Sequence, residues 1–119
     1  MPINVLIPAD NLAYLLKYDS VYGRYDKSLE HTEEMLTVGG QTCRVLKEKD
    51  PAQLPWKDMG IDLVFECTGI FTTKEDLAKH VKAGAKHVIL SAPAKSEGVP
   101  TVVHGVTKAK SNENIISCA

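Results

Sequence analysis

The sequence predicts an α/β fold, a partial doubly wound parallel sheet that carries a β-hairpin insertion. Three observations lead to this prediction. A strand–helix–strand pattern runs through residues 61–91, two alternating runs flank a Gly-Gly pair at 39–40, and an apolar run occupies residues 115–118. A strand, a helix and a strand within roughly 30 residues form one βαβ crossover, which is expected to be right-handed. At 119 residues the length predicts a single domain.

The first part of the chain is predicted to hold a strand, a helix and a hairpin. Residues 3–7 are apolar except for Asn4 and are expected to be the end of a strand. Residues 8–17 carry leucines at helical spacing behind a proline that suits a helix start. The aromatic-rich residues 18–25 are expected to be a loop. The runs at 35–38 and 41–46 alternate between apolar and polar side chains, which is typical of strands joined by a tight turn.

The crossover occupies the middle of the chain. Residues 63–65 are apolar without alternation, a pattern that predicts a strand buried on both faces of a parallel sheet. Thr73 is expected to cap the following helix, and Gly84 is expected to close it in the left-handed conformation. The second strand is predicted at residues 87–90. Two further strands are expected beyond it, at residues 101–106 and 115–118.

The candidate ligand site lies where the predicted strands end. In open α/β sheets, ligands bind outside the carboxyl ends of the strands. Thr68, Gly69 and Phe71 follow the first strand of the crossover, and Ser91 follows the second. A plain strand-to-helix turn covered by one apolar residue explains the first three equally well on sequence alone.

Composition and charge argue against several function classes. With 14 basic and 15 acidic residues the net charge is -1, which gives no electrostatic footprint for nucleic acid or an anionic membrane. No apolar run approaches the roughly 18 residues that a membrane span needs. No signal-like segment follows Met1, so a cytoplasmic location is expected. Three widely spaced cysteines favour reduced thiols over disulfides or a zinc site.

The titratable side chains form no catalytic or metal-binding constellation. The four histidines lack metal-ligand spacing, and we expect them at the surface or at strand ends: His31, His80, His87 and His104. Cys67 is expected to be a small core residue. Cys118 lies in an apolar run, where its thiol would stay protonated. Glu66 is expected to be a hydrogen-bonded structural carboxylate, and Asp19 to organise its loop by accepting backbone hydrogen bonds.

Seven short segments are informative as a set. They are LKYDS at 16–20, DPA at 50–52, LPW at 54–56, ECTG at 66–69, AGAK at 83–86, SAP at 91–93 and NIIS at 114–117. Together they resemble phosphorylating glyceraldehyde-3-phosphate dehydrogenase, in the family's order and spacing and over nearly the whole chain. The combination is highly specific. Erythrose-4-phosphate dehydrogenase, a close relative, is the alternative.

The resemblance implies a Rossmann-like domain that binds NAD, with NADP as the alternative cofactor. The parent enzyme would be a cytoplasmic homotetramer that oxidises and phosphorylates glyceraldehyde 3-phosphate to 1,3-bisphosphoglycerate in glycolysis. Its partners would be small molecules, the cofactor and the triose phosphate. Five residues inherit cofactor-binding roles from the family: Thr68 and Gly69 at the ribose and phosphates, Phe71 and Lys49 beside the adenine, and Ser91 toward the nicotinamide.

The resemblance also implies that residues 1–119 are a middle piece of the cofactor domain, without the catalytic domain. The family's glycine-rich phosphate loop lies upstream of the position of Ile3, and its Ser-Cys-Thr-Thr-Asn nucleophile motif follows the position of Ala119. No catalytic residue is therefore expected here, and Cys118 is in the wrong register to be the nucleophile. The alternative is a truncated, non-catalytic copy that acts by association. Where this chain has Val5, the family has an aspartate that accepts hydrogen bonds from the adenosine ribose, so the choice between NAD and NADP is affected.

Overall fold

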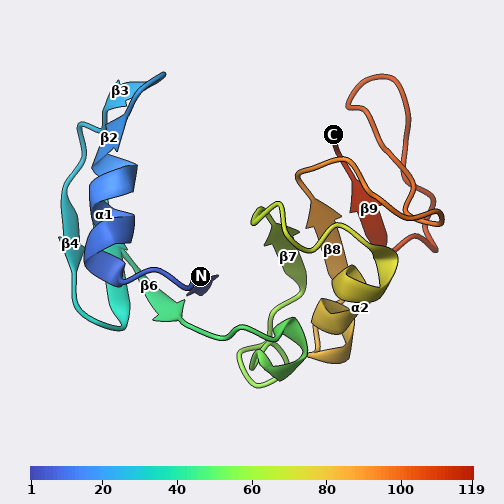
Figure 1. The fold of residues 1–119 in the computed structure, drawn as a ribbon, viewed down its shortest axis with the longest axis horizontal. Coiled ribbons are helices and arrows are strands. Elements are labelled where there is room, and N and C mark those ends of the chain that lie inside the picture. The colour runs from blue at the N-terminus through green and yellow to red at the C-terminus, as the bar shows by residue number, and fades with distance from the viewer. The chain divides into compact units, whose positions relative to one another are not determined.

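The computed structural model describes residues 1–119, which divide into two compact units, Met1–Lys49 and Asp50–Ala119. Each unit combines helix and sheet, so the predicted α/β class is confirmed (Figure 1). That the chain is one incomplete cofactor domain stays a prediction. No helix has the length and apolar character that a membrane span requires.

The first unit is a four-stranded sheet with one helix packed on it. Its elements are β1 (Ile3–Asn4), α1 (Ala9–Lys17), β2 (Tyr18–Asp19), β3 (Gly23–Arg24), β4 (Leu29–His31), β5 (Met35–Val38) and β6 (Gln41–Leu46). The strand order is β1-β6-β5-β4, with β1 parallel to β6 and the other pairs antiparallel. The short strands β2 and β3 form a separate ribbon.

The hairpin of β5 and β6 is confirmed. Gly39 and Gly40 have φ values of 56° and 84°, the positive region that a two-residue hairpin turn demands. Leu36 lies opposite Cys43, and both are buried. The helix α1 places its two buried alanines, Ala9 and Ala13, against the Leu36 side of this sheet. Small side chains at these positions let the helix approach the strands closely.

Two predictions for this unit are corrected. The strand expected at 3–7 covers only Ile3–Asn4, because pairing with β6 ends at the Val5 amide and Pro8 already caps α1. The loop expected at 18–25 contains the ribbon of β2 and β3. Asp19 Oδ1 accepts the Val21 and Tyr22 amides there, at 2.7 Å each, so its predicted loop-organising role is confirmed.

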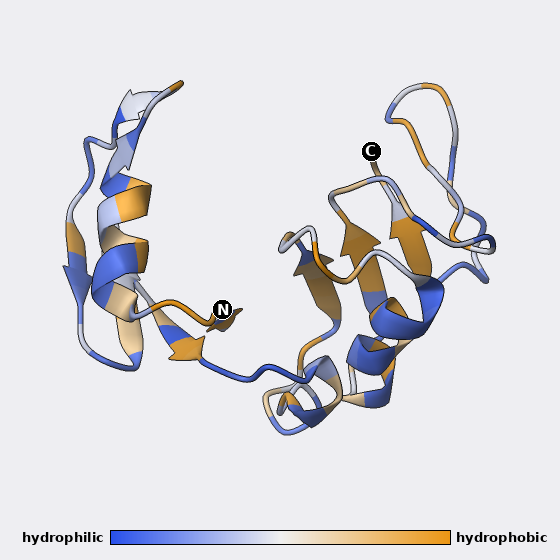
Figure 2. Ribbon diagram, viewed as in Figure 1, coloured by the Kyte–Doolittle hydropathy of each residue, from blue (hydrophilic) through white to orange (hydrophobic).

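The second unit is a three-stranded parallel sheet with a helix on one face. Its elements are a 3-10 turn η1 (Pro51–Gln53), β7 (Leu63–Glu66), α2 (Lys74–Lys82), β8 (His87–Leu90) and β9 (Ile115–Ser117). The strand order is β7-β8-β9, and α2 connects β7 to β8 (Figure 1). The predicted βαβ crossover is therefore confirmed. Figure 2 shows that the three strands are mostly apolar whereas α2 is largely hydrophilic, as expected for a helix with only one buried side.

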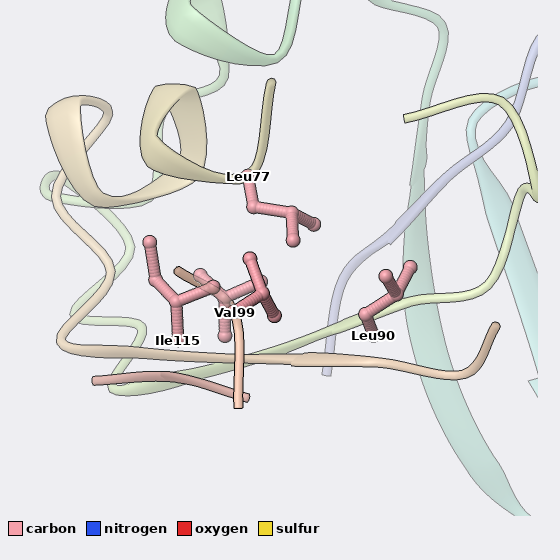
Figure 3. Packing of buried hydrophobic residues seen from close by; sticks show 5 residues of the cluster. Leu77, Leu90, Val99 and Ile115 are labelled. Carbon is pink, nitrogen blue, oxygen red and sulfur yellow. The ribbon is translucent and has the colours of Figure 1, made fainter. Parts of the chain in front are cut away.

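The core of the second unit lies between α2 and the sheet. Leu77 of α2 has no exposed surface, nor have Val88 and Leu90 of β8. Val99 and Ile115 complete the cluster (Figure 3). In that view the Leu77 side chain leaves the helix and points toward the other labelled residues. The loop that carries Val99 thus contributes a side chain to the core.

Both predicted ends of α2 are confirmed. Thr73 Oγ1 accepts the Asp76 amide at 3.2 Å and donates to the Asp76 carboxylate at 2.8 Å, a variant of the capping box. Gly84 follows the helix with φ +117°. Gly84 also lies against Lys57, so close that an added Cβ would stand 2.6 Å from the Lys57 backbone nitrogen. This position therefore requires glycine for space as well as for conformation.

The strand β7 is not buried on both faces as predicted. Val64 and Glu66 are buried on the α2 side, whereas Leu63 and Phe65 are 42% and 63% exposed. Alternate side chains of a strand point to opposite faces, and α2 covers only one of them. The run of apolar side chains at residues 63–65 therefore did not reveal that a helix covers only one face of this strand.

The strand predicted at 101–106 is also corrected. Only Thr101 forms a bridge, to Ser117 of β9. The amides of Val106 and Thr107 both donate to the Val103 carbonyl, at 3.0 and 2.9 Å, and this turn bends the chain away from the sheet. The last predicted strand exists as β9 and ends one residue earlier than expected.

Candidate functional site

The carboxyl ends of the three parallel strands meet at one edge of the second unit. The Ser91 amide donates to the Glu66 carbonyl at 3.0 Å, and the Ser91 hydroxyl approaches the same oxygen at 3.3 Å. The Cys118 amide likewise donates to the Leu90 carbonyl at 3.0 Å. These bonds bring the segments after β7, β8 and β9 side by side. The edge is the place where open α/β sheets bind ligands.

The turn at Thr68 and Gly69, here called the Thr68 turn, follows β7 at this edge. Glu66 Oε1 accepts both donors of Thr68, the amide at 2.9 Å and the hydroxyl at 2.6 Å. The Ile70 amide donates in turn to Thr68 Oγ1 at 3.2 Å. Gly69 has φ +72°, with nothing within 4 Å of the position of a Cβ. The backbone there is open to a ligand, and the Gly69 amide donates to no group of this chain.

Glu66 anchors the turn from within the unit. Its second oxygen, Oε2, lies 2.8 Å from His80 Nε2, and the Trp56 indole donates to His80 Nδ1 at 3.1 Å. Burial opposes ionisation of Glu66, but the hydrogen bonds from His80 and Thr68 outweigh it and hold the Glu66 pKa below its ordinary value. The predicted structural carboxylate is confirmed, and it is ionised.

Two predictions about these side chains were wrong. His80, expected at the surface, is buried on the inner face of α2. It follows Leu77 by three positions, the spacing of one helix face, and that signal could have located it. Cys67, expected in the core, is exposed because it continues the uncovered face of Leu63 and Phe65. The role of Trp56 as the donor behind His80 was also missed.

The five predicted site residues divide between the two units. Thr68, Gly69, Phe71 and Ser91 belong to the second unit, and Thr68, Gly69 and Ser91 are exposed at its carboxyl edge. Phe71 is half-buried, with the Lys79 ammonium 6.0 Å from its ring centroid. Lys49 is exposed and belongs to the first unit. Their roles toward a cofactor stay predictions.

The edge offers neutral hydrogen-bonding groups. No cluster of histidine, cysteine or carboxylate side chains could hold a metal ion. Cys118 Sγ lies 3.4 Å from the Leu90 carbonyl oxygen, the contact of a thiol donor. A free amide, a hydroxyl oxygen and a serine suit a ligand rich in hydroxyl and ether oxygens, such as the ribose of a dinucleotide.

Comparison with known proteins identifies the relatives of this chain. Residues 1–74 match the family model described as glyceraldehyde 3-phosphate dehydrogenase, NAD binding domain. The glyceraldehyde-3-phosphate dehydrogenase of Streptomyces coelicolor is 47% identical over 120 residues, covering 98% of this chain and 35% of the relative. That of Chlamydia pneumoniae is 49% identical over 106 residues, covering 89% of this chain and 31% of the relative. That of Thermotoga maritima is 48% identical over 119 residues, covering 98% and 35%. The chain spans about a third of the length of these relatives.

Proposed function

Since this chain belongs to the glyceraldehyde-3-phosphate dehydrogenase family through its NAD-binding domain, we propose that it supplies part of the NAD site of such an enzyme. The observation that carries the proposal is the family match over residues 1–74, which extends through the Thr68 turn. The open carboxyl edge of the second unit supports it, since it presents Thr68, Gly69 and Ser91 to one ligand.

The residues of this chain bind and orient the cofactor. Gly69 offers a backbone amide without a Cβ in the way, and Ser91 stands one strand along the edge. In this proposal Ser91 faces the nicotinamide half of the cofactor. Phe71 covers the adenine. When bound, NAD supplies the acceptor for a hydride. Val5 carries no carboxylate that would repel a 2′-phosphate, so NADP is the alternative cofactor.

The whole enzyme oxidises and phosphorylates glyceraldehyde 3-phosphate to 1,3-bisphosphoglycerate in glycolysis. We place it in the cytoplasm as a homotetramer, with the cofactor and the triose phosphate as its small-molecule partners. The net charge of -1 supports the view that neither nucleic acid nor a membrane is a partner.

Two glycines allow a matched test of the cofactor edge. Gly69 and Gly105 have similar φ values, +72° and +80°, and neither has an atom within 4 Å of a Cβ position. Alanine therefore strains both backbones alike, but only Gly69 lies in the Thr68 turn. The added Cβ of Gly69→Ala would keep a ligand from reaching the Gly69 amide. Calorimetric titration of the chain with NAD should therefore show binding weakened about tenfold, the value of one hydrogen bond that the ligand can no longer form.

Gly105→Ala should leave the affinity for NAD within about twofold of the unaltered chain, since one substitution outside the site removes no contact. Equal losses in the two variants would show that the Thr68 turn does not touch the cofactor. Lack of saturable NAD binding by the unaltered chain would refute the proposed function itself.

A further inference from the structure

Four residues of the second unit form one continuous hydrogen-bond chain that ends at the candidate site. Trp56, His80 and Glu66 are all buried, with exposed fractions of 4% each. The chain runs from the Trp56 indole to His80 Nδ1, from His80 Nε2 to Glu66 Oε2, and from Glu66 Oε1 to Thr68. It connects the segment before β7, the helix α2 and the strand end.

The direction of each bond follows from the chemistry of the groups. An indole nitrogen can only donate, so His80 Nδ1 must be the acceptor and carry no proton. A neutral imidazole then carries its proton on Nε2 and donates it to Glu66 Oε2. In a doubly protonated His80, Nδ1 would also carry a proton, and two N–H groups would face each other with no acceptor between them. All bonds of the chain therefore point toward the Glu66 carboxylate, which accepts from His80 and twice from Thr68.

This direction leaves Thr68 with a restricted hydrogen-bonding capacity. Its hydroxyl proton is donated to Glu66 Oε1, and one of its two lone pairs accepts the Ile70 amide. A single acceptor position remains on Thr68 Oγ1. The Gly69 amide beside it is the free donor.

We propose that Glu66 is a positioning residue of the cofactor site, which fixes the Thr68 turn so that Thr68 Oγ1 accepts a hydrogen bond from a ribose hydroxyl while the Gly69 amide donates to a neighbouring oxygen of the same ligand. The inference rests on the proposed function and deepens it. The family resemblance implied only that Thr68 and Gly69 line the ribose and the phosphates, without saying which residue contacts which group. The bonding pattern assigns Thr68 to a group that donates a proton, which an ionised phosphate cannot do.

Electrostatics favour the same assignment. The ionised Glu66 carboxylate lies 2.6 Å behind Thr68 Oγ1, in the buried interior where charge is weakly screened. A phosphate at the same oxygen would face this negative charge as well as a lone pair. A neutral hydroxyl meets neither penalty, and its proton is attracted by the polarised Thr68 oxygen.

The hydrogen-bond chain can be tested without a ligand. In nitrogen-15 NMR spectra of the chain at neutral pH, His80 should be the Nε2–H tautomer, and the Trp56 indole proton should be shifted as a hydrogen-bonded donor. Glu66→Gln leaves one oxygen for three donors, so the Thr68 and Gly69 amide signals should move. An Nδ1–H tautomer of His80 would refute the proposal, as would unmoved amides. If Glu66→Gln does not fold, the tautomer of His80 in the unaltered chain still shows whether the hydrogen-bond chain has the proposed direction.

The ligand assignment is tested with NAD as the probe. Thr68→Val keeps the shape but loses the acceptor, and should weaken NAD binding about tenfold. Thr68→Ser restores the hydroxyl and should bring the affinity back to within about threefold, a rescue that a purely structural role of the methyl group would not give. Thr42→Val is the matched control, because Thr42 pairs only with Thr37, at 3.0 Å on the exposed hairpin, and it should change nothing.

Inorganic phosphate is the competing probe. We expect it to leave the Thr68 and Gly69 amide signals in place, whereas NAD moves them to saturation. Saturable shifts caused by phosphate alone would overturn the assignment to ribose. If the unaltered chain fails to bind NAD, the proposed function and the ribose assignment are both refuted. The His80 tautomer then still tests the hydrogen-bond chain, because that measurement needs no ligand.

Discussion

His80 of α2 and Glu66 of β7 are joined by a hydrogen bond of 2.8 Å between two buried side chains. The bond ties the crossover helix to the last residue of the strand that precedes it. Because the same carboxylate also holds Thr68, any change that loosens the helix is felt at the ligand edge. The conformation of the Thr68 turn therefore depends on the packing of α2 against the sheet.

Glu66 should make the stability of the second unit depend on pH. Its pKa is held below the ordinary value, so the ionised carboxylate favours the folded state. This contribution is fully present above the pKa of the unfolded chain and is lost as the pH falls through the folded value. Urea unfolding followed at Trp56, the single tryptophan, should show stability falling more steeply between about pH 5 and pH 3 in the unaltered chain than in Glu66→Gln.

Asp62 provides the control for this pH dependence. The hydrogen bond and charge of Lys86 also lower the Asp62 pKa, but both side chains are exposed and their interaction is screened by water. Asp62→Asn should leave the pH profile close to that of the unaltered chain. A profile in which Glu66→Gln and the unaltered chain run parallel would contradict the role given to Glu66.

Leu77→Ala should be among the most damaging substitutions in the second unit. Leu77 is fully buried against β8, so its removal leaves a cavity and should cost about 3–5 kcal/mol of unfolding free energy. Leu63→Ala is the matched control, since Leu63 is 42% exposed on the uncovered face and should cost less than about 1 kcal/mol. Urea titration at Trp56 measures both. Similar losses would mean that the α2 face does not hold the core.

Gly84→Ala should destabilise through a collision as well as through strain. An added Cβ would lie 2.5 Å from the Lys57 Cβ and 2.6 Å from its nitrogen, in a backbone that is already left-handed. We expect a loss of roughly 2–4 kcal/mol. Gly60→Ala has similar left-handed strain, with φ +64°, but open space, and should cost only about 1–2 kcal/mol. Equal losses of unfolding free energy in the two variants, measured by thermal or urea unfolding, would show that contact with Lys57 adds nothing to the cost of Gly84→Ala.

Val5→Asp should have opposite effects on stability and on cofactor affinity. Val5 is half-buried and packs on the cluster of the first unit, so a carboxylate there should cost about 1–3 kcal/mol. All four tyrosines lie in the first unit, so near-ultraviolet circular dichroism follows its unfolding: Tyr14, Tyr18, Tyr22 and Tyr25. If the new carboxylate accepts the ribose hydroxyls, NAD binding should tighten by about 1–3 kcal/mol.

Val5→Thr serves as its isosteric control, because it adds a polar atom without a charge. It should cost less stability than Val5→Asp. An unchanged calorimetric affinity of Val5→Asp for NAD would show that this side chain does not reach the ribose.

The sequence was most informative where one local rule decides the structure. The Gly39 and Gly40 turn, the Thr73 cap and the left-handed Gly84 each depend on the chemistry of a few neighbouring residues, and all were predicted correctly. The βαβ crossover was readable for the same reason, because its strand and helix patterns follow one another within a short segment.

The errors concern burial, which depends on what lies opposite in space. Cys67 and Phe65 are apolar, yet they face away from α2, whereas the polar His80 faces into the core. His80 is tolerated there because the Trp56 indole donates a hydrogen bond to one ring nitrogen and the Glu66 carboxylate accepts one from the other. No spacing rule in the sequence links these three residues, so the hydrogen-bond chain behind Thr68 was visible only in the structure.

The strand pairings of the first unit set the order in which it should fold. Val38 and Gln41 need only close a two-residue turn, whereas Ile3 must find Val45 across the intervening helix and hairpin. Short loops close at a lower entropic cost and form faster. We expect the hairpin to be protected first and β1 to dock last, in pulsed hydrogen exchange during refolding. Protection of Val5, whose amide bonds the Leu46 carbonyl, before the hairpin amides would reverse this order.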